Sequence, residues 1–157
     1  MPLRVQQPEP PSDDEQALID CSPSVVLDRF DLGDYRLKPH HYERLLSVAD
    51  EIPILTGFDL VLNIRGHTDK SGSERLNLGL SLSRAFEVFA YLQFFFGGTI
   101  PVETQVEGLG ETSPIPGADA ARNRRVELRF CRRPPRPSPP TILTAQGRQR
   151  ARPTVRR

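Results

Sequence analysis

An acidic residue and an arginine are spaced so that they could bind one small charged molecule. Asp69 ends the run Gly66-His67-Thr68-Asp69, directly after an apolar segment, and Arg84 lies within the helical pattern that follows. An acid at the end of a strand and an arginine one helical segment later can face the same pocket. A carboxylate binds an ammonium group, and the two-pronged guanidinium matches a carboxylate. The pair therefore suits a ligand that carries both an ammonium and a carboxylate.

Further polar residues could support this pair. Asn77 and Thr68 could supply neutral hydrogen bonds, and Arg124 could hold a second carboxylate. Arg125 alternates with Arg124 across a strand, so we assign Arg124 to the pocket and Arg125 to structure. Taken alone, however, the aspartate of the pair could equally form a structural ion pair with Arg84 or cap the helix that follows it.

The sequence gives less support to a metal site or a catalytic base at a histidine than to ligand binding by the aspartate and the arginine. His67 and Asp69 would point to the same side of a strand, but no third metal ligand is evident, so we expect no metal. As a catalytic base, His67 lacks a nucleophile and an orienting acid. The sequence therefore favours a binding protein over an enzyme such as a metal-dependent hydrolase, and we expect no cofactor.

The hydrophobic pattern predicts the elements that would position these side chains. Strands are expected at residues 25–27, 58–64, 102–106 and 125–130, and helices at residues 39–52 and 73–96. The nearly continuous apolar run at 58–64 is typical of a central strand covered on both faces. Pro53 is expected to end the first helix, and Ser81 to cap a fresh start of the second helix after Gly79. This order predicts an α/β (more strictly α+β) domain with a mixed four-stranded sheet packed against helices.

Composition divides the chain into three parts. The net charge is +1, but residues 132–157 hold eight arginines and no acid, which leaves −7 for residues 1–131. We expect a disordered acidic, proline-rich leader at 1–22, one domain at 23–132 and a disordered Pro/Arg-rich tail at 133–157. The tail could bind nucleic acid or an anionic membrane by charge alone, but a solvated end is the more usual interpretation, and we expect no nucleic acid partner.

The sequence shows neither a membrane span nor a secretory signal. No segment approaches the roughly 20 apolar residues that a spanning helix needs. Residues 1–20 lack a basic start followed by an apolar core.

Two cysteines, Cys21 and Cys131, flank the predicted domain. A disulfide requires their Cα atoms to lie within about 7 Å of each other, which the sequence cannot show. The rarity of cytosolic disulfides favours two free thiols.

Several separately spaced motifs resemble the OmpA-like domain family, in the same order. They are Gly66-His67-Thr68-Asp69, Asn77, Leu80-Ser81-x-x-Arg84-Ala85, Gly108-x-Gly110-Glu111-x-x-Pro114 and Asn123-Arg124-Arg125-Val126. The resemblance extends over about residues 25–131. This family is the peptidoglycan-associating module of outer-membrane proteins, peptidoglycan-associated lipoproteins and flagellar stator proteins.

The resemblance implies non-covalent binding of the peptidoglycan stem peptide, typically at diaminopimelate, whose side chain ends in an ammonium and a carboxylate on one carbon. Asp69 would take the ammonium and Arg84 the carboxylate. The supporting residues would be Asn77, Arg124, Thr68 and, at the rim, Asp31. Replacing either Asp69 or Arg84 with alanine is then expected to abolish binding and to leave the fold intact.

The resemblance also implies a location in the periplasm or at the cell outer membrane, where the domain would anchor an envelope component to the wall. Other cell-envelope proteins are further candidate partners. The missing export signal leaves a cytoplasmic location, or a fragment of a longer protein, open. The alternative function is a protein-interaction module of the same fold without cell-wall binding.

Overall fold

The computed structural model describes Cys21 and residues 25–132. The predicted tail, and the predicted leader apart from Cys21, lie outside the described residues. In chain order the elements are β1 (Val25–Leu27), α2 (Pro39–Leu55), β2 (Leu60–Gly66), α3 (Glu74–Phe95), β3 (Glu103–Gly108), α4 (Ala120–Asn123) and β4 (Val126–Arg132). Within these residues, no helix combines the length and the apolar character that a membrane crossing requires.

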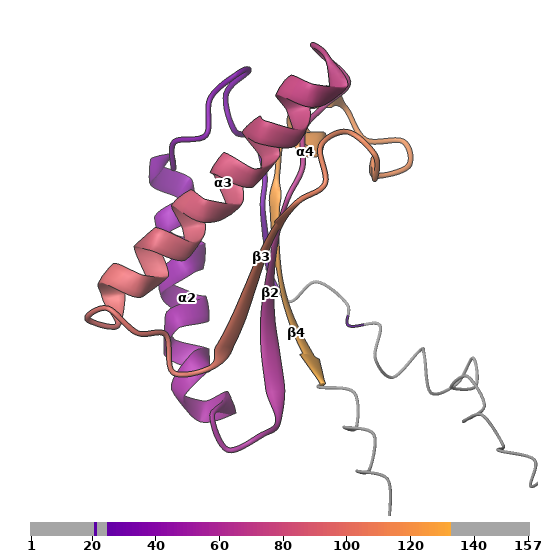
Figure 1. The fold of residues 1–157 in the computed structure, drawn as a ribbon. Helices are drawn as coiled ribbons and strands as arrows, with labels where there is room; N and C mark the ends of the chain where they lie inside the picture. Colours follow the sequence, from indigo (N-terminus) through magenta and orange to yellow (C-terminus); the bar gives the residue numbers. More distant parts are fainter. Residues whose placement is uncertain (1–20, 22–24, 133–157) are drawn as a thin grey trace, which may run out of the picture.

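The four strands form one mixed sheet in the order β1-β4-β2-β3. β2 pairs in parallel with β3, and β4 runs antiparallel to both β1 and β2. Helices α2 and α3 lie on the same side of this sheet (Figure 1). The predicted fold class and order of strands and main helices are therefore confirmed. The four-residue helix α4 is an addition, within a connection that was predicted to be turn-rich.

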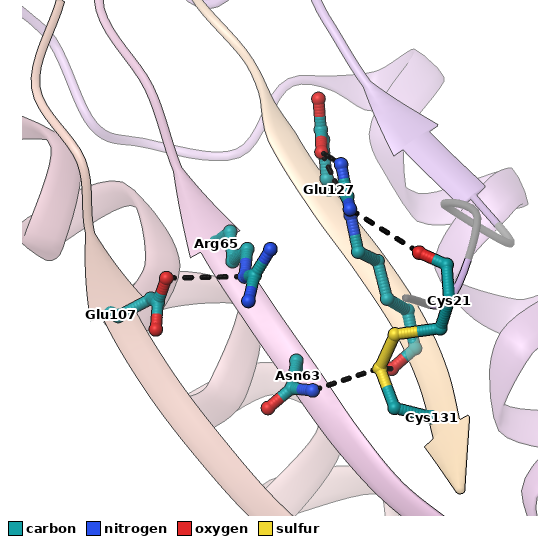
Figure 2. Close-up of a disulfide and its surroundings, with 7 residues drawn as sticks. Cys21, Asn63, Arg65, Glu107, Glu127 and Cys131 are labelled. Carbon is teal, nitrogen blue, oxygen red and sulfur yellow. Dashed lines mark hydrogen bonds and ion pairs between the residues drawn. A yellow bond between two sulfur atoms is a disulfide. The ribbon is translucent and has the colours of Figure 1, made fainter. Parts of the chain in front are cut away.

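The strand predicted at 58–64 lies inside the sheet, but the described helices cover only one of its two faces (Figure 1). Leu62 and Ile64 are fully buried in the core under the helices. Asn63 and Arg65 alternate with them and point to the opposite face (Figure 2), which none of the described helices covers (Figure 1). Val61 made the apolar run look continuous, but it lies on that outer face with Cys131, its partner across the sheet.

Helix α2 continues past the proline that was expected to end it. Pro53 lies in the last turn of α2, which ends at Leu55. A proline this close to the end removes only one backbone hydrogen bond, since few turns remain to be disrupted. The hydroxyl of Thr56 donates to the carbonyl of Pro53 at 2.8 Å and completes the helix end.

Helix α3 is a single continuous helix, so the prediction of a second start at Ser81 was also wrong. Ser73 caps the helix, because its hydroxyl accepts a hydrogen bond from the amide of Leu76 at 3.3 Å. Ser81 is fully buried in the middle of the helix, and its hydroxyl accepts a hydrogen bond from the amide of Gly110 at 2.9 Å. The serine therefore ties α3 to the loop after β3.

Two glycines let α3 approach the sheet closely. Gly66 and Gly108 are partners across β2 and β3. A Cβ atom on Gly66 would overlap the carbonyl of Ser81, and one on Gly108 would collide with the backbone of Leu82. Only glycine fits such a contact between backbones. The contact fixes the first half of α3 against the end of β2, where the predicted binding residues lie.

Cys21 and Cys131 form a disulfide, with their Cα atoms 5.0 Å apart, so the expectation of two free thiols was wrong. Figure 2 shows the bridge on the outer face of the sheet, where Asn63 Nδ2 lies 2.9 Å from Cys131 Sγ. The carbonyl of Cys21 accepts a hydrogen bond from Arg129 at 3.2 Å. The rarity argument concerned the cytosol and gave no information about the distance between two residues so far apart in the chain.

Candidate ligand-binding site

A cavity of about 430 Å³, here called cavity A, lies where β2 ends and α3 begins. Five of the six predicted binding residues line it: Thr68, Asp69, Asn77, Arg84 and Arg124. They come from the segment after β2, from α3 and from the segment before β4. Its charged lining residues are one aspartate and two arginines, so the wall carries a net charge of +1. This balance suits a ligand with at least one carboxylate, including a zwitterion.

Asp69 is 7% exposed and is held by two hydrogen bonds. Its Oδ1 accepts from the amide of Ser71 at 2.9 Å, and its Oδ2 accepts from Arg124 Nη1 at 2.8 Å. Burial raises the pKa of Asp69, but the hydrogen bonds from Arg124 and Ser71 outweigh it and bring the pKa below its usual value. The residue therefore provides an ionised, oriented carboxylate. It neither caps α3 nor forms the ion pair with Arg84 that the sequence left open.

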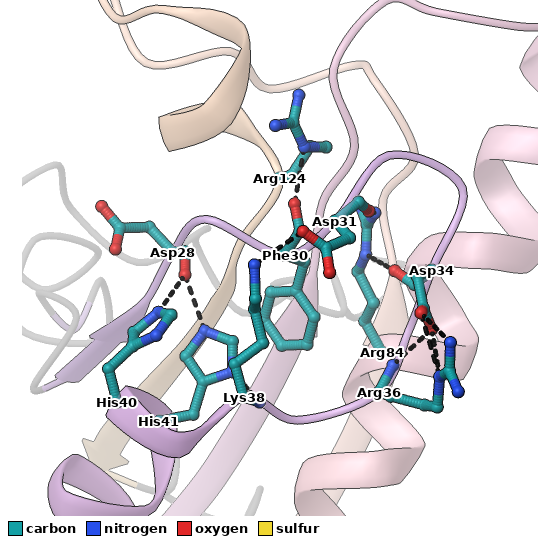
Figure 3. A network of polar contacts seen from close by, with 10 residues as sticks. All are labelled: Asp28, Phe30, Asp31, Asp34, Arg36, Lys38, His40, His41, Arg84 and Arg124. Carbon is teal, nitrogen blue, oxygen red and sulfur yellow. Dashed lines mark hydrogen bonds and ion pairs between the residues drawn. The ribbon is translucent and has the colours of Figure 1, made fainter.

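Arg84 is fully buried and bonded to three backbone carbonyls. Its Nε donates to Asp34 at 2.8 Å, its Nη1 to His67 at 2.9 Å and its Nη2 to Asp31 at 3.0 Å. The guanidinium also lies 5.4 Å from the ring centre of Phe30. Figure 3 shows the side chain among the residues of the loop between β1 and α2. These bonds use three of the five N–H groups of a guanidinium, so two are not engaged by these carbonyls.

Burial and then the positive charge of Arg124 lower the pKa of Arg84 to about 10. Arg84 thus remains a cation at neutral pH. The shift also shows that the two guanidinium groups interact across the cavity. A ligand carboxylate between them would relieve this repulsion.

Arg124 connects the acid to the loop after β1. Besides its bond to Asp69, its Nε donates to the carbonyl of Phe30 at 2.6 Å (Figure 3). Arg125 points away from the cavity, where its Nε donates to Glu127 at 2.8 Å and its Nη2 to the carbonyl of Ser113 at 3.0 Å. The two arginines therefore take opposite faces, as their alternation suggested.

Asn77 and Thr68 differ in whether their side-chain polar atoms already form hydrogen bonds within the protein. Asn77 Nδ2 donates to Glu111 at 2.6 Å and to the carbonyl of Asp69 at 3.4 Å. Thr68 is 4% exposed, yet its hydroxyl has no hydrogen-bond partner. An unpaired buried hydroxyl costs about 1–3 kcal/mol. It is therefore an atom that a ligand could satisfy.

The carboxylate of Asp31 is not on the wall of cavity A. The side chain is 64% exposed and accepts a hydrogen bond from Lys38 Nζ at 2.6 Å (Figure 3). The loop turns the carbonyl of Asp31 inward, toward Arg84, and its side chain outward. Its neighbours Leu32 and Gly33, which the sequence did not single out, line the cavity instead.

His67 lies on the outer face of the sheet, near Arg125 and Glu127. Its ring is 2% exposed, and neither ring nitrogen has a hydrogen-bond partner. Burial and then the positive charge of Arg125 lower the pKa of His67 to about 4, so the ring is neutral at physiological pH. Among the residues that the structure describes, no three His, Cys, Asp or Glu side chains cluster as metal ligands.

The model of the OmpA family matches residues 29–127, which is more than half of the chain. The chain therefore belongs to the OmpA family. The matched segment contains all the residues that line cavity A.

Individual proteins agree with this assignment. The chain is 38% identical over 96 residues to the peptidoglycan-binding protein ArfA of Mycobacterium tuberculosis, which covers 59% of this chain and 28% of that protein. It is 35% identical over 103 residues to outer membrane protein A of Bordetella avium, covering 63% of this chain and 51% of that protein. The chain thus spans only part of the length of these relatives.

Among solved structures, the peptidoglycan-associated lipoprotein from Burkholderia pseudomallei is similar, with a TM-score of 0.57 and 26% sequence identity. The match covers 66% of this chain and 87% of that one. The solved structure can thus be superposed on most of the described residues.

Proposed function

We propose that this domain binds peptidoglycan without covalent chemistry, by holding the diaminopimelate of the stem peptide in cavity A. The observation that carries the proposal is the shared lining of that cavity by Asp69, Arg84 and Arg124. A carboxylate and two guanidinium groups around one small cavity are complementary to a group with one ammonium and one or two carboxylates. The names of two relatives, a peptidoglycan-binding protein and a peptidoglycan-associated lipoprotein, support peptidoglycan as the ligand.

Asp69 would bind the ammonium of the ligand. A carboxylate has about four lone-pair sites, and the hydrogen bonds from Ser71 and Arg124 occupy two of them. The ammonium can therefore bind without breaking the ion pair between Asp69 and Arg124. Because the carboxylate is already oriented, little ordering is needed on binding.

Arg84 would bind the carboxylate on the same carbon. Its three bonds to backbone carbonyls fix the plane of the guanidinium, so its two remaining N–H groups have a set direction. Arg124 would take a second carboxylate, and the hydroxyl of Thr68 would gain its missing partner. The ligand would thus satisfy polar groups that are already buried.

We further propose that the domain works in the periplasm or at the outer membrane and attaches an envelope component to the wall. The disulfide between Cys21 and Cys131 supports this location, because disulfides form and persist in oxidising compartments. The similarity of the chain to an outer membrane protein also supports a location in the cell envelope. Other envelope proteins would be the partners that the domain connects to peptidoglycan.

Co-sedimentation with purified sacculi that contain diaminopimelate tests the proposal. Asp69→Asn keeps the shape of the side chain and removes the charge, so we expect it to abolish co-sedimentation. Asp50→Asn, at an exposed position on α2, is the matched control and should sediment like the parent protein. Undiminished binding by Asp69→Asn would refute the assigned role of Asp69, and a parent protein that stays in the supernatant would refute peptidoglycan binding.

A further inference from the structure

A second cavity, here called cavity B, adjoins cavity A and has a volume of about 530 Å³. The two cavities share Thr68, Asp69 and Ser71 in their walls. They therefore lie on either side of the short segment that follows β2. A ligand held at Asp69 in cavity A has an adjoining space into which its next part could extend.

The far wall of cavity B is a loop whose shape is fixed by its own hydrogen bonds. The amide of Ile115 donates to Asn123 Oδ1 at 2.8 Å, and the amide of Ala118 donates to the carbonyl of Ile115 at 3.1 Å. Pro114 and Pro116 restrict the backbone further. The wall is thus formed before any ligand arrives, which lowers the entropic cost of binding.

The lining of cavity B defines the chemistry of its occupant. The loop side is apolar and built of small or rigid residues, including Pro114, Ile115 and Ala118. This surface suits a methyl-sized side chain. Thr68 contributes a buried hydroxyl without a partner, which can either donate to or accept from a peptide group. Two acids, Asp69 and Glu111, also line cavity B, but each already accepts a hydrogen bond from a side chain outside the loop. Lys70 is exposed at the rim and carries a positive charge that could pair with a carboxylate.

We infer that cavity B binds the residue that follows the diamino acid in the stem peptide, an alanine-sized residue with its carboxylate toward Lys70. This inference rests on the proposed function, because cavity A must hold the diamino acid for the next residue to reach cavity B. The domain then recognises two consecutive residues of the stem, and distinguishes a stem that ends at the diamino acid from one that is longer by an alanine.

Calorimetric titration with two stem peptides tests this inference. One is a tripeptide that ends at diaminopimelate, and the other is the tetrapeptide that adds one alanine. We expect the parent protein to bind the tetrapeptide about tenfold more tightly. Ala120→Tyr places a bulky ring in cavity B, and Lys70→Gln removes the charge at its rim. Each variant should lose most of this preference and keep the affinity for the tripeptide, which also shows that it is folded.

Ala90→Tyr is the matched control, since Ala90 is exposed on α3 and lines neither cavity A nor cavity B. It should keep the preference of the parent protein. Equal affinity of the parent protein for the two peptides would overturn the inference while leaving the proposed function standing. An Ala120→Tyr variant that keeps the full preference would overturn it as well. If neither peptide binds the parent protein, both the proposed function and this inference fail.

Discussion

Arg124, rather than Arg84, is the arginine that pairs with Asp69, with 2.8 Å between Arg124 Nη1 and Asp69 Oδ2. The two arginines of cavity A therefore differ in what their guanidinium groups bind. Arg124 orients the acid, and Arg84 is anchored on backbone carbonyls with two N–H groups left over.

Thr68→Val should weaken binding without weakening the fold. Valine has nearly the shape of threonine but lacks the hydroxyl, which is buried and unpaired. Its removal should raise the free energy of unfolding by about 1 kcal/mol, while the affinity for stem peptide falls because a hydrogen bond to the ligand is lost. Urea denaturation and calorimetric titration measure the two effects. Thr99→Val, at an exposed position, is the control. A variant that binds as well as the parent protein would exclude a role for the hydroxyl in binding.

Gly66→Ala should destabilise the domain strongly. The added methyl group would overlap the carbonyl of Ser81, so β2 and α3 would have to separate. We expect a loss of roughly 2 kcal/mol or more. Gly79→Ala is the matched substitution within α3, where a Cβ atom meets nothing within 4 Å, and it should stabilise by about 0.5–1 kcal/mol. Thermal unfolding of both variants gives the comparison. Similar melting temperatures would mean that the close contact of helix and sheet carries little energy.

Reduction of the disulfide should lower stability substantially. Cys21 and Cys131 are separated by 110 residues, so the bridge closes a long loop. Such cross-links typically contribute about 2–5 kcal/mol, in part by restricting the unfolded chain. Denaturation of the protein with and without reductant measures the difference, and the Cys21→Ser/Cys131→Ser double variant should reproduce the reduced protein. If the double variant remains sensitive to reductant, the effect does not come from this bridge.

Stability should decrease as the pH falls from about 6.5 to about 4, partly because of His67. The unfolded histidine has a pKa near 6.5, whereas burial lowers the pKa of His67 to about 4 in the folded state. Between these values the unfolded state binds the extra proton, so acid favours unfolding by up to roughly 1.4 kcal/mol per pH unit. Urea denaturation at several pH values gives the slope. His67→Gln should flatten it, and the exposed His40→Gln should not. A slope that His67→Gln leaves unchanged would assign the effect elsewhere.

Local patterns in the sequence were enough to predict the sheet, the two long helices and the closeness of most of the candidate binding residues. Asp69 follows a strand and Arg84 lies on the helix after it, and chain direction alone brings such residues to the same end of a sheet. The motifs around Gly66 and Gly108 also contained the glycines that α3 requires, although their role became evident only from the contact with Ser81.

The remaining features depend on distances between segments far apart in the chain. Pairing of Asp69 with Arg124 joins two loops 55 residues apart. Two of the three carbonyls around Arg84, those of Asp31 and Asp34, depend on the path of the loop between β1 and α2, which side-chain identity does not encode. These bonds also change the expectation for Arg84→Ala, which would remove a hydrogen bond from each of three carbonyls and should destabilise the fold. Asp69 is therefore the better residue for testing binding.

The most direct test of the central claim is calorimetric titration with two stem tripeptides, one ending in diaminopimelate and the other in lysine. They differ by the terminal carboxylate that Arg84 is proposed to bind, while the ammonium for Asp69 is present in both. We expect the diaminopimelate peptide to bind and the lysine peptide to bind roughly 100-fold more weakly, as expected for the loss of a charged hydrogen-bonded pair. Equal affinities for the two peptides would contradict recognition of a zwitterionic group in cavity A.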